Sequence, residues 1–202
     1  MTPPITVVSG TPTFTGRDLE ALAEQVAIAW TSAAEADWSV AAGTLEWTCT
    51  ATADHAVDCV YAPAFFLASR RTDRYPEVGL DLTLASRATP ALLVESLEIA
   101  TRMLVSLVDS TPHDVRAILF QRPSAVTGTP RDFVPRAALE LMLHAHDVCS
   151  GLAVPFEPAR DLCIRLREHT RPWPVWSMWY GLDTTDDPWA DLLRGSGRIR
   201  RP

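Results

Sequence analysis

Apolar residues recur at helical spacing in four long segments of the chain, and this periodicity limits the fold more than any other feature. From Gly16 to Ala36, apolar residues step by three and four positions behind the N-cap candidate Thr15. Of the four segments, the third in chain order starts at Thr89-Pro90 and ends near Ser110. A helix with one apolar stripe must pack that stripe against a neighbour. The sequence therefore predicts an all-α fold built on a four-helix bundle.

The second and fourth predicted helices are apolar over most of their circumference. The second begins near Thr48 or Thr50 and ends near Ser69, and the fourth lies between an Asp132 cap and Gly151 at the C′ position. Pro63 is expected to bend the second helix. Helices of this type are buried on most sides, so these two are expected to lie against other helices in the bundle.

Shorter elements are predicted for the rest of the chain. Val115–Phe120 is a candidate short strand, a fifth helix opens at Pro158 and runs to about His169, and a last helix starts at Asp187-Pro188 and stops at Gly195. Arg70–Arg87 is expected to be irregular. Trp173, Trp176 and Trp179 lie in a Pro-interrupted segment that is expected to cover the bundle as a lid. With 202 residues and no internal repeat, the chain is interpreted as one domain, residues 1–202.

Composition excludes several classes of function. All 18 cationic residues are arginine, so enzymes that need a Schiff-base or Walker lysine are excluded. The net charge is −7, and no nucleic-acid partner is expected. The basic cluster of Arg198, Arg200 and Arg201 is interpreted as a solvated tail. The N-terminus has no signal-peptide pattern and no apolar run is long enough to span a membrane, which predicts a cytoplasmic protein with reduced thiols and no membrane partner.

Ionisable side chains lie within both of the mostly apolar helices, where burial costs several kcal/mol unless the groups are paired or bound to a metal. Arg136, Glu140 and His144 are spaced four residues apart and therefore share one face of the fourth helix. A Glu and a His one turn apart can both reach one ion, a donor pair that suits zinc and also nickel, cobalt or iron. His55 in the second helix would supply a third ligand and leave one coordination position open. The alternative is that each histidine is a hydrogen-bonded core residue.

Three stretches carry a resemblance to a known family. The stretch from Trp47 to His55 (WTCTATADH) is similar to the W-T/S-x-x-x-x-x-x-H signature of mycothiol-dependent maleylpyruvate isomerase-like proteins. The stretch from Arg136 to Asp147 (RAALELMLHAHD) resembles the R-x-x-x-E-x-x-x-H-x-W-D helix of that family. The tail from Asp187 to Arg198 is similar to its D-P-W-x-x-L-L…G-R ending, so the resemblance spans nearly the whole chain in the right order.

This resemblance implies a DinB-like four-helix bundle, with short accessory helices and a possible strand pair. It implies a zinc ion held by His55, Glu140 and His144. The sequence departs from the family at His146, which stands where the family has Trp. The isomerases of the family also carry a separate C-terminal domain, for which the 202 residues leave no room.

The neighbours of the predicted ligands are interpreted individually. His146 lies about 200° around the helix from His144 and is expected to pack rather than to bind the ion. Cys59 lies one turn after His55 and is interpreted as a packing residue, although a thiolate ligand would close the site. Asp58 and Asp147 are candidates for orienting an imidazole, with a solvated or capping role as the alternative. Arg136 is expected either to anchor an anionic group or to pair with Glu140.

Two functions are consistent with these residues. The first is a metal-dependent isomerase-like or S-transferase-like enzyme, in which a small thiol such as mycothiol binds the ion as a thiolate and attacks an electrophilic small molecule. The second is a non-catalytic metal- or ligand-binding bundle with a regulatory role. A closed four-ligand site that includes Cys59 would favour the second function. The sequence does not fix the oligomeric state, for which a homodimer is one candidate.

Overall fold

Helices account for most of the structure, a computed structural model that describes residues 13–76, 88–122 and 125–200. The four long helices are α1 (Gly16–Ser32), α2 (Cys49–Ser69), α3 (Pro90–Ser110) and α4 (Pro130–Gly151). The short elements are β1 (Ala117–Phe120), β2 (Val126–Gly128), α5 (Arg160–Thr170), α6 (Val175–Met178) and α7 (Pro188–Gly195). The predicted all-α class is confirmed, and the predicted strand has a partner strand in the structure.

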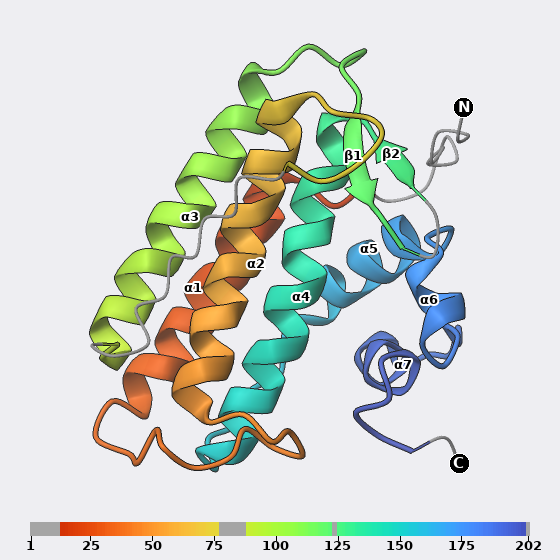
Figure 1. Cartoon of the computed structure of the whole chain (residues 1–202). Coiled ribbons are helices and arrows are strands. Elements are labelled where there is room, and N and C mark those ends of the chain that lie inside the picture. Colours follow the sequence, from red (N-terminus) through yellow and green to blue (C-terminus); the bar gives the residue numbers. More distant parts are fainter. Residues whose placement is uncertain (1–12, 77–87, 123–124, 201–202) are drawn as a thin grey trace.

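The long helices form a four-helix bundle (Figure 1). Helix α2 packs against α3 and α4, and α1 packs against the same two helices from the other side. Their apolar faces meet in one core, whose largest fully buried side chains include Trp30, Phe133 and Leu141. The α2–α4 face and the α1–α3 face are therefore on opposite sides of the bundle.

Local signals explain most helix ends, with two differences from the sequence prediction. Helix α1 ends at Ser32 rather than near Ala36, because the Trp38 indole packs edge-on against Trp30 and donates a hydrogen bond to the Ala33 carbonyl. Helix α4 starts earlier than predicted. Its N-cap is Thr129, and Asp132 is the third helical residue, which completes a capping box with Thr129.

Gly151 has a different role from the predicted one. It is the last residue of α4, and the left-handed residue that follows is Ala153. A Cβ at position 151 would lie 2.3 Å from the Ala41 carbonyl oxygen and 2.7 Å from the Cys49 sulfur. Glycine is therefore needed because the end of α4 closely approaches the loop that precedes α2, not because it closes the helix.

Strands β1 and β2 pair antiparallel and lie beside the upper ends of α2 and α4 (Figure 1). Ala117 pairs with Gly128 and Phe120 with Val126, with an irregular register between them. The Ile118 amide also donates to the Arg71 carbonyl, at 2.6 Å, which joins the hairpin to the segment after α2.

Helices α5, α6 and α7 form a layer beside α4 (Figure 1). Trp173 and Trp176 are buried within this layer, where Trp173 contacts Phe120 and Trp176 contacts Trp179. Trp173 and Trp176 belong to the same buried apolar cluster as side chains of the long helices, so this segment packs against the side of the bundle. Asp191 of α7 is fully buried and forms an ion pair with Arg167 of α5, which attaches the last helix to the layer.

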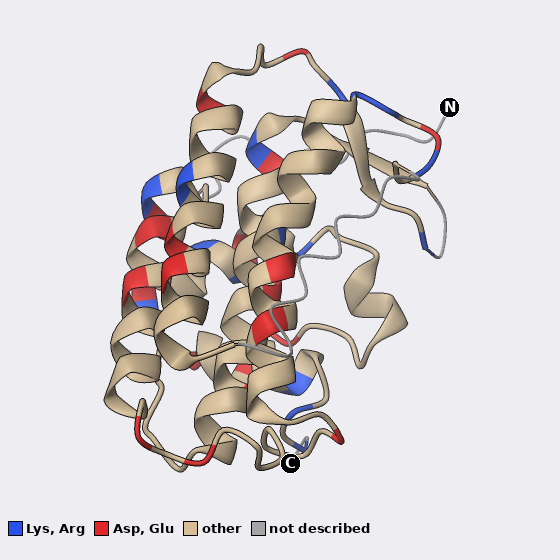
Figure 2. Cartoon of the chain, turned by 60° about the vertical axis from the view of Figure 1, so that its left-hand side comes forward, with Lys and Arg blue, Asp and Glu red and all other residues tan. Residues whose placement is uncertain are grey.

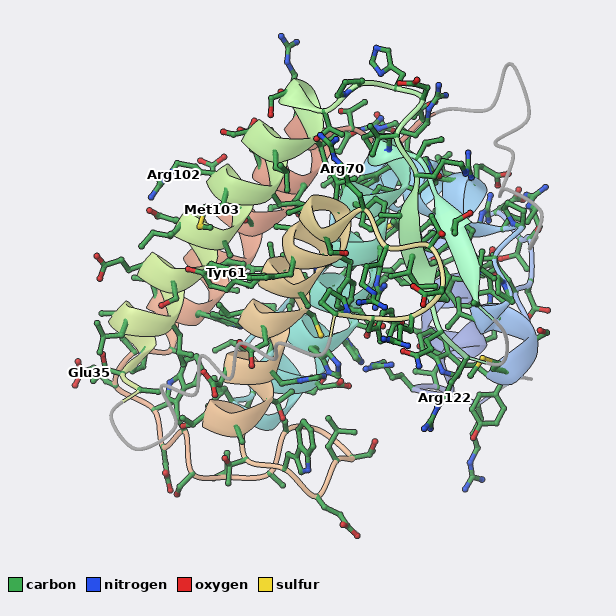
Figure 3. All side chains as sticks on the ribbon, turned by 45° about the horizontal axis from the view of Figure 1, so that its top comes forward. Glu35, Tyr61, Arg70, Arg102, Met103 and Arg122 are labelled. Carbon is green, nitrogen blue, oxygen red and sulfur yellow. The ribbon has the colours of Figure 1, made fainter. Side chains whose placement is uncertain are left out.

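The surface of the bundle at α1 and α3 carries both apolar and charged side chains. A groove of about 630 Å³ lies between α1 and α3, and Glu24 and Arg102 are among its lining residues. Figure 2 marks the positions of acidic and basic residues along the long helices, and Figure 3 shows the side chain of Arg102 projecting outward from α3. Among the described residues, no helix combines the length and apolarity needed to cross a bilayer. The N-terminal segment, most of the predicted irregular stretch Arg70–Arg87, and Arg201 lie outside the described residues.

Candidate metal centre

His55 and His144 face each other across the contact between α2 and α4. Their ring centroids are 5.0 Å apart, with the ring planes at 74°. Both side chains are partly buried, and Trp47 packs edge-on against His55 with a centroid separation of 5.3 Å. The two imidazoles that the sequence assigned to one ion are therefore brought together from different helices.

The charge state of His55 suits a metal ligand. Burial lowers the pKa of His55, and the nearby His144 lowers this pKa further, whereas Glu140 and Asp54 act to raise it. The net direction favours the neutral imidazole, which is the form that binds a metal.

Cys59 lies closer to this pair than a packing role requires. Its Sγ atom is 3.5 Å from Nε2 of His55, one helical turn earlier on α2. One donor atom from each of His55, Cys59 and His144 lies within 4.8 Å of the other two. Burial raises the pKa of the Cys59 thiol well above its ordinary value, Glu140 raises it further and Arg136 opposes the rise. In the absence of a cation, Cys59 is therefore a neutral thiol.

Glu140 is at the edge of the group. Its Oε2 atom lies 3.7 Å from Nε2 of His144, as expected for residues one turn apart on α4. The carboxylate is about one-third exposed and does not belong to the close set of three donors formed by His55, Cys59 and His144. The structure thus places Glu140 beside one predicted ligand, and its coordination of an ion remains a prediction.

Asp147 lies behind His144 on the side away from Glu140. Its Oδ2 atom is 3.3 Å from Nδ1 of His144, although the contact is not aligned as a hydrogen bond. The Arg198 guanidinium binds both carboxylate oxygens of Asp147, at 2.7 to 3.2 Å. Burial acts to raise the pKa of Asp147, but the contacts with His144 and Arg198 outweigh it and lower this pKa. An ionised carboxylate here favours a proton on Nδ1 of His144 and leaves Nε2 available as a ligand atom.

Arg198 therefore differs from its predicted role in a solvated tail. The Arg198 side chain is only 15% exposed because it reaches from the residues after α7 to the buried Asp147 of α4. The sequence signal for this contact was weak, since 51 residues separate the two partners.

Arg136 is held by groups on the hairpin and on the segment after α2. It donates hydrogen bonds to the Leu119 carbonyl and the Tyr75 hydroxyl. Its guanidinium also lies over the rings of Phe66, Tyr75 and Phe120, 4.7 to 5.4 Å from their centroids. These contacts give Arg136 a structural role, and its role as an anion anchor remains a prediction.

The other histidines and Asp58 lie apart from the close donor set. His146 packs edge-on against Trp189 of α7, with ring centroids 5.6 Å apart, which agrees with its predicted packing role. His169 is fully buried and lies 3.2 Å from Asp132. Asp58 is partly buried on α2, and its charge acts to raise the pKa of Cys59 and of Tyr61.

Comparisons with known proteins supply no further assignment: no family model matches the chain, and no match was found among curated proteins or solved structures. The chemistry of the centre is therefore argued from the side chains themselves.

Proposed function

We propose that this protein binds one divalent cation between α2 and α4 through His55, Glu140 and His144. The observation that carries the proposal is the approach of the two imidazoles from different helices, with ring centroids 5.0 Å apart. A carboxylate oxygen of Glu140 lies 3.7 Å from Nε2 of His144, which puts an oxygen donor beside one of the two imidazoles. Such a mixed donor set fits zinc first, with nickel, cobalt or iron as alternatives.

The surroundings of the site support this assignment. Two protonated imidazoles at this distance would repel each other, and burial lowers the pKa of His55, which favours its neutral, metal-binding form. Asp147 is held by Arg198 on the far side of His144, an arrangement found behind many metal-bound histidines. The sequence motifs also resemble those of the maleylpyruvate isomerase-like family, whose DinB-like bundle would hold zinc through residues of its second and fourth helices.

The leading functional hypothesis is a thiol-using isomerase-like or S-transferase-like enzyme. A divalent cation at this position would supply a Lewis acid that keeps a small thiol, such as mycothiol, in its nucleophilic thiolate form. In this hypothesis His55, Glu140 and His144 position the cation, and Arg136 attracts an anionic group of the thiol or of the electrophilic substrate. Arg136 lies on the face of α4 that carries Glu140 and His144, one turn before Glu140.

A second function is favoured by one specific observation. The Cys59 sulfur lies 3.5 Å from His55 Nε2, so a protein thiol is available as a fourth ligand. A cation with four protein ligands has no open position, which is typical of structural or regulatory sites rather than catalytic ones. A non-catalytic metal-binding bundle is therefore the alternative to the enzyme.

Metal content tests the proposal directly. We expect the purified protein to contain about one divalent ion per chain by elemental analysis, or to take one up when zinc is added. His144→Ala should lose this ion, because it removes a donor from the centre of the site. His146→Ala is the matched control: it removes a histidine from the same helix that packs against Trp189 instead. If the wild-type protein binds neither zinc, nickel nor cobalt, the proposal is wrong.

Thiol binding separates the two functions. If the centre has an open position, a small thiol should bind to the metal-loaded protein at millimolar concentration or below. Calorimetry in buffers of different ionisation enthalpy would then show the release of about one proton, because the cation captures the thiolate. A fully loaded protein that binds no thiol would support the non-catalytic alternative.

A further inference from the structure

Cys59 is not a ligand in the proposed three-ligand site of His55, Glu140 and His144, although its sulfur lies 3.5 Å from Nε2 of His55. We propose that Cys59 is itself a ligand of the cation and completes a site of two imidazoles, one thiolate and the Glu140 carboxylate. This inference rests on the proposed function, because it assumes that His55 and His144 hold a cation.

Helix geometry places the cysteine where a ligand is needed. His55 and Cys59 are four residues apart on α2, so their side chains stack on one face of the helix. That face is directed toward His144 of α4, since all three residues contribute to one close donor set. Together with Glu140, two ligands from α2 and two from α4 would thus bind the ion from both sides of the helix contact.

The separation between sulfur and nitrogen fits coordination of a shared ion. Zinc binds thiolate sulfur at about 2.3 Å and imidazole nitrogen at about 2.0 to 2.1 Å. In a tetrahedral site these bond lengths put the two donor atoms about 3.6 Å apart. The structure has Cys59 Sγ and His55 Nε2 at 3.5 Å. The side chains can therefore accept an ion between them with little rearrangement.

A weak hydrogen bond between the Cys59 thiol and His55 is the competing explanation for this contact. That bond would account for the approach of Cys59 to His55 but not for the presence of His144 within the same 4.8 Å set. Glu140, Asp58 and Arg136 are the charged groups that act on the cysteine, and two of the three are acidic. Their net negative charge near the site favours a cation there.

Metal–sulfur bond formation involves no change in oxidation state. The Cys59 S–H bond breaks, its proton passes to solvent or buffer, and the sulfur lone pair forms the bond to the cation. If an external thiol later replaced Cys59 on the cation, the sulfur of Cys59 would take up a proton again. In that exchange the external thiol loses one proton and Cys59 gains one, so no net proton is released.

Cobalt substitution tests the assignment without reference to any activity. Metal-free protein in reducing buffer would be loaded with Co²⁺, and its absorption spectrum recorded. We expect wild-type protein to show the near-ultraviolet charge-transfer band that a cobalt–thiolate bond produces. Cys59→Ser should lose this band while still binding Co²⁺ through its nitrogen and carboxylate ligands, with affinity lowered at least about tenfold. Cys163→Ser, which changes a thiol buried in α5, is the control and should keep the band.

The outcomes separate this inference from the proposed function. Wild-type protein that binds Co²⁺ stoichiometrically without the charge-transfer band would overturn the role of Cys59 and leave the His55–His144 site intact. Wild-type protein that binds no Co²⁺ and no Zn²⁺ would overturn both. Because the decisive spectrum is that of the wild-type protein, the test does not depend on the folding of a variant, and Cys59→Ala provides a second substitution.

Discussion

Asp132 lies in the first turn of α4 with its side chain 1% exposed, and both of its oxygen atoms are engaged. One oxygen accepts hydrogen bonds from the amide and the hydroxyl of Thr129, and the other lies 3.2 Å from Nε2 of His169. The residue thus caps α4 and joins it to α5. A carboxylate at this depth is stable only because each oxygen has a partner.

Asp132→Ala should therefore destabilise the protein strongly. It removes the Asp132 half of the capping box with Thr129 and leaves His169 buried without its partner, which together should cost on the order of 3 kcal/mol. Asp18→Ala is a matched control, because Asp18 forms the same capping box with Thr15 but its side chain is 13% exposed. Urea unfolding of both variants would measure the difference. Equal losses in the two variants would show that the buried contact with His169 contributes no more than the partly exposed ion pair of Asp18 with Arg165.

Some contacts at the site join residues that are close along the chain, and others join residues that are far apart. This difference explains which site contacts the sequence could predict. Glu140 and His144 share a helix face through their spacing alone, and the structure has them 3.7 Å apart. His55 and Cys59 have the same spacing, so their contact was also predictable, but cysteine is so often a core residue that packing was preferred. The partners of Arg136 were not predictable, because Tyr75 lies 61 residues away along the chain.

At the scale of elements, the chain end after α7 is connected to the candidate centre. Gly197 has a φ of +79°, which turns the backbone, and Arg198 then reaches both oxygens of Asp147 on α4. Asp147 in turn lies 3.3 Å from Nδ1 of His144. The segment after α7 therefore supports the orientation of a predicted ligand, His144, through Asp147.

Arg198→Ala should weaken metal binding although Arg198 contacts no ligand. Loss of a group behind a metal-bound histidine typically costs about 10- to 100-fold in affinity, and we expect a change in this range for zinc. Competition with a chromophoric chelator would measure it. Arg165→Ala is the control, since Arg165 also binds a carboxylate through Nε and NH2, that of Asp18, outside the donor set of the centre. An unchanged zinc affinity in Arg198→Ala, with unchanged helicity, would show that Asp147 needs no support from the tail.

Elements were predictable where their signals were local. The Thr-Pro start of α3 and the Asp-Pro start of α7 are encoded within a few residues, and both helices begin where the sequence predicts. The early end of α1 depends on the contact of Trp38 with Trp30, and the side layer depends on contacts between α5 and α7. Such contacts between separate segments have no periodic signature, so the sequence does not predict them.

At the scale of the whole molecule, the candidate centre lies at the contact between α2 and α4. These helices bury residues on most of their surfaces, and among the described elements they pack together more extensively than any other pair. An ion bound by residues of both helices would crosslink two segments that are far apart in sequence. Cation binding is therefore expected to be coupled to the stability of the entire bundle rather than to one loop.

Melting temperature should rise with zinc. A ligand that binds only the folded state at 100 times its dissociation constant stabilises that state by about 2.7 kcal/mol. For a chain of this size, that free energy corresponds to a rise of roughly 5 to 10 °C. Scans should be made above pH 6.5, the ordinary pKa of histidine, because burial lowers the pKa of His55 and the folded protein loses stability as pH falls below that value.

Calorimetric scans of chelator-treated and zinc-loaded protein would show the shift in melting temperature. His144→Ala should melt at the same temperature in both samples, and His146→Ala should retain the difference. A wild-type melting temperature that zinc does not change would mean that the imidazoles of α2 and α4 do not share an ion.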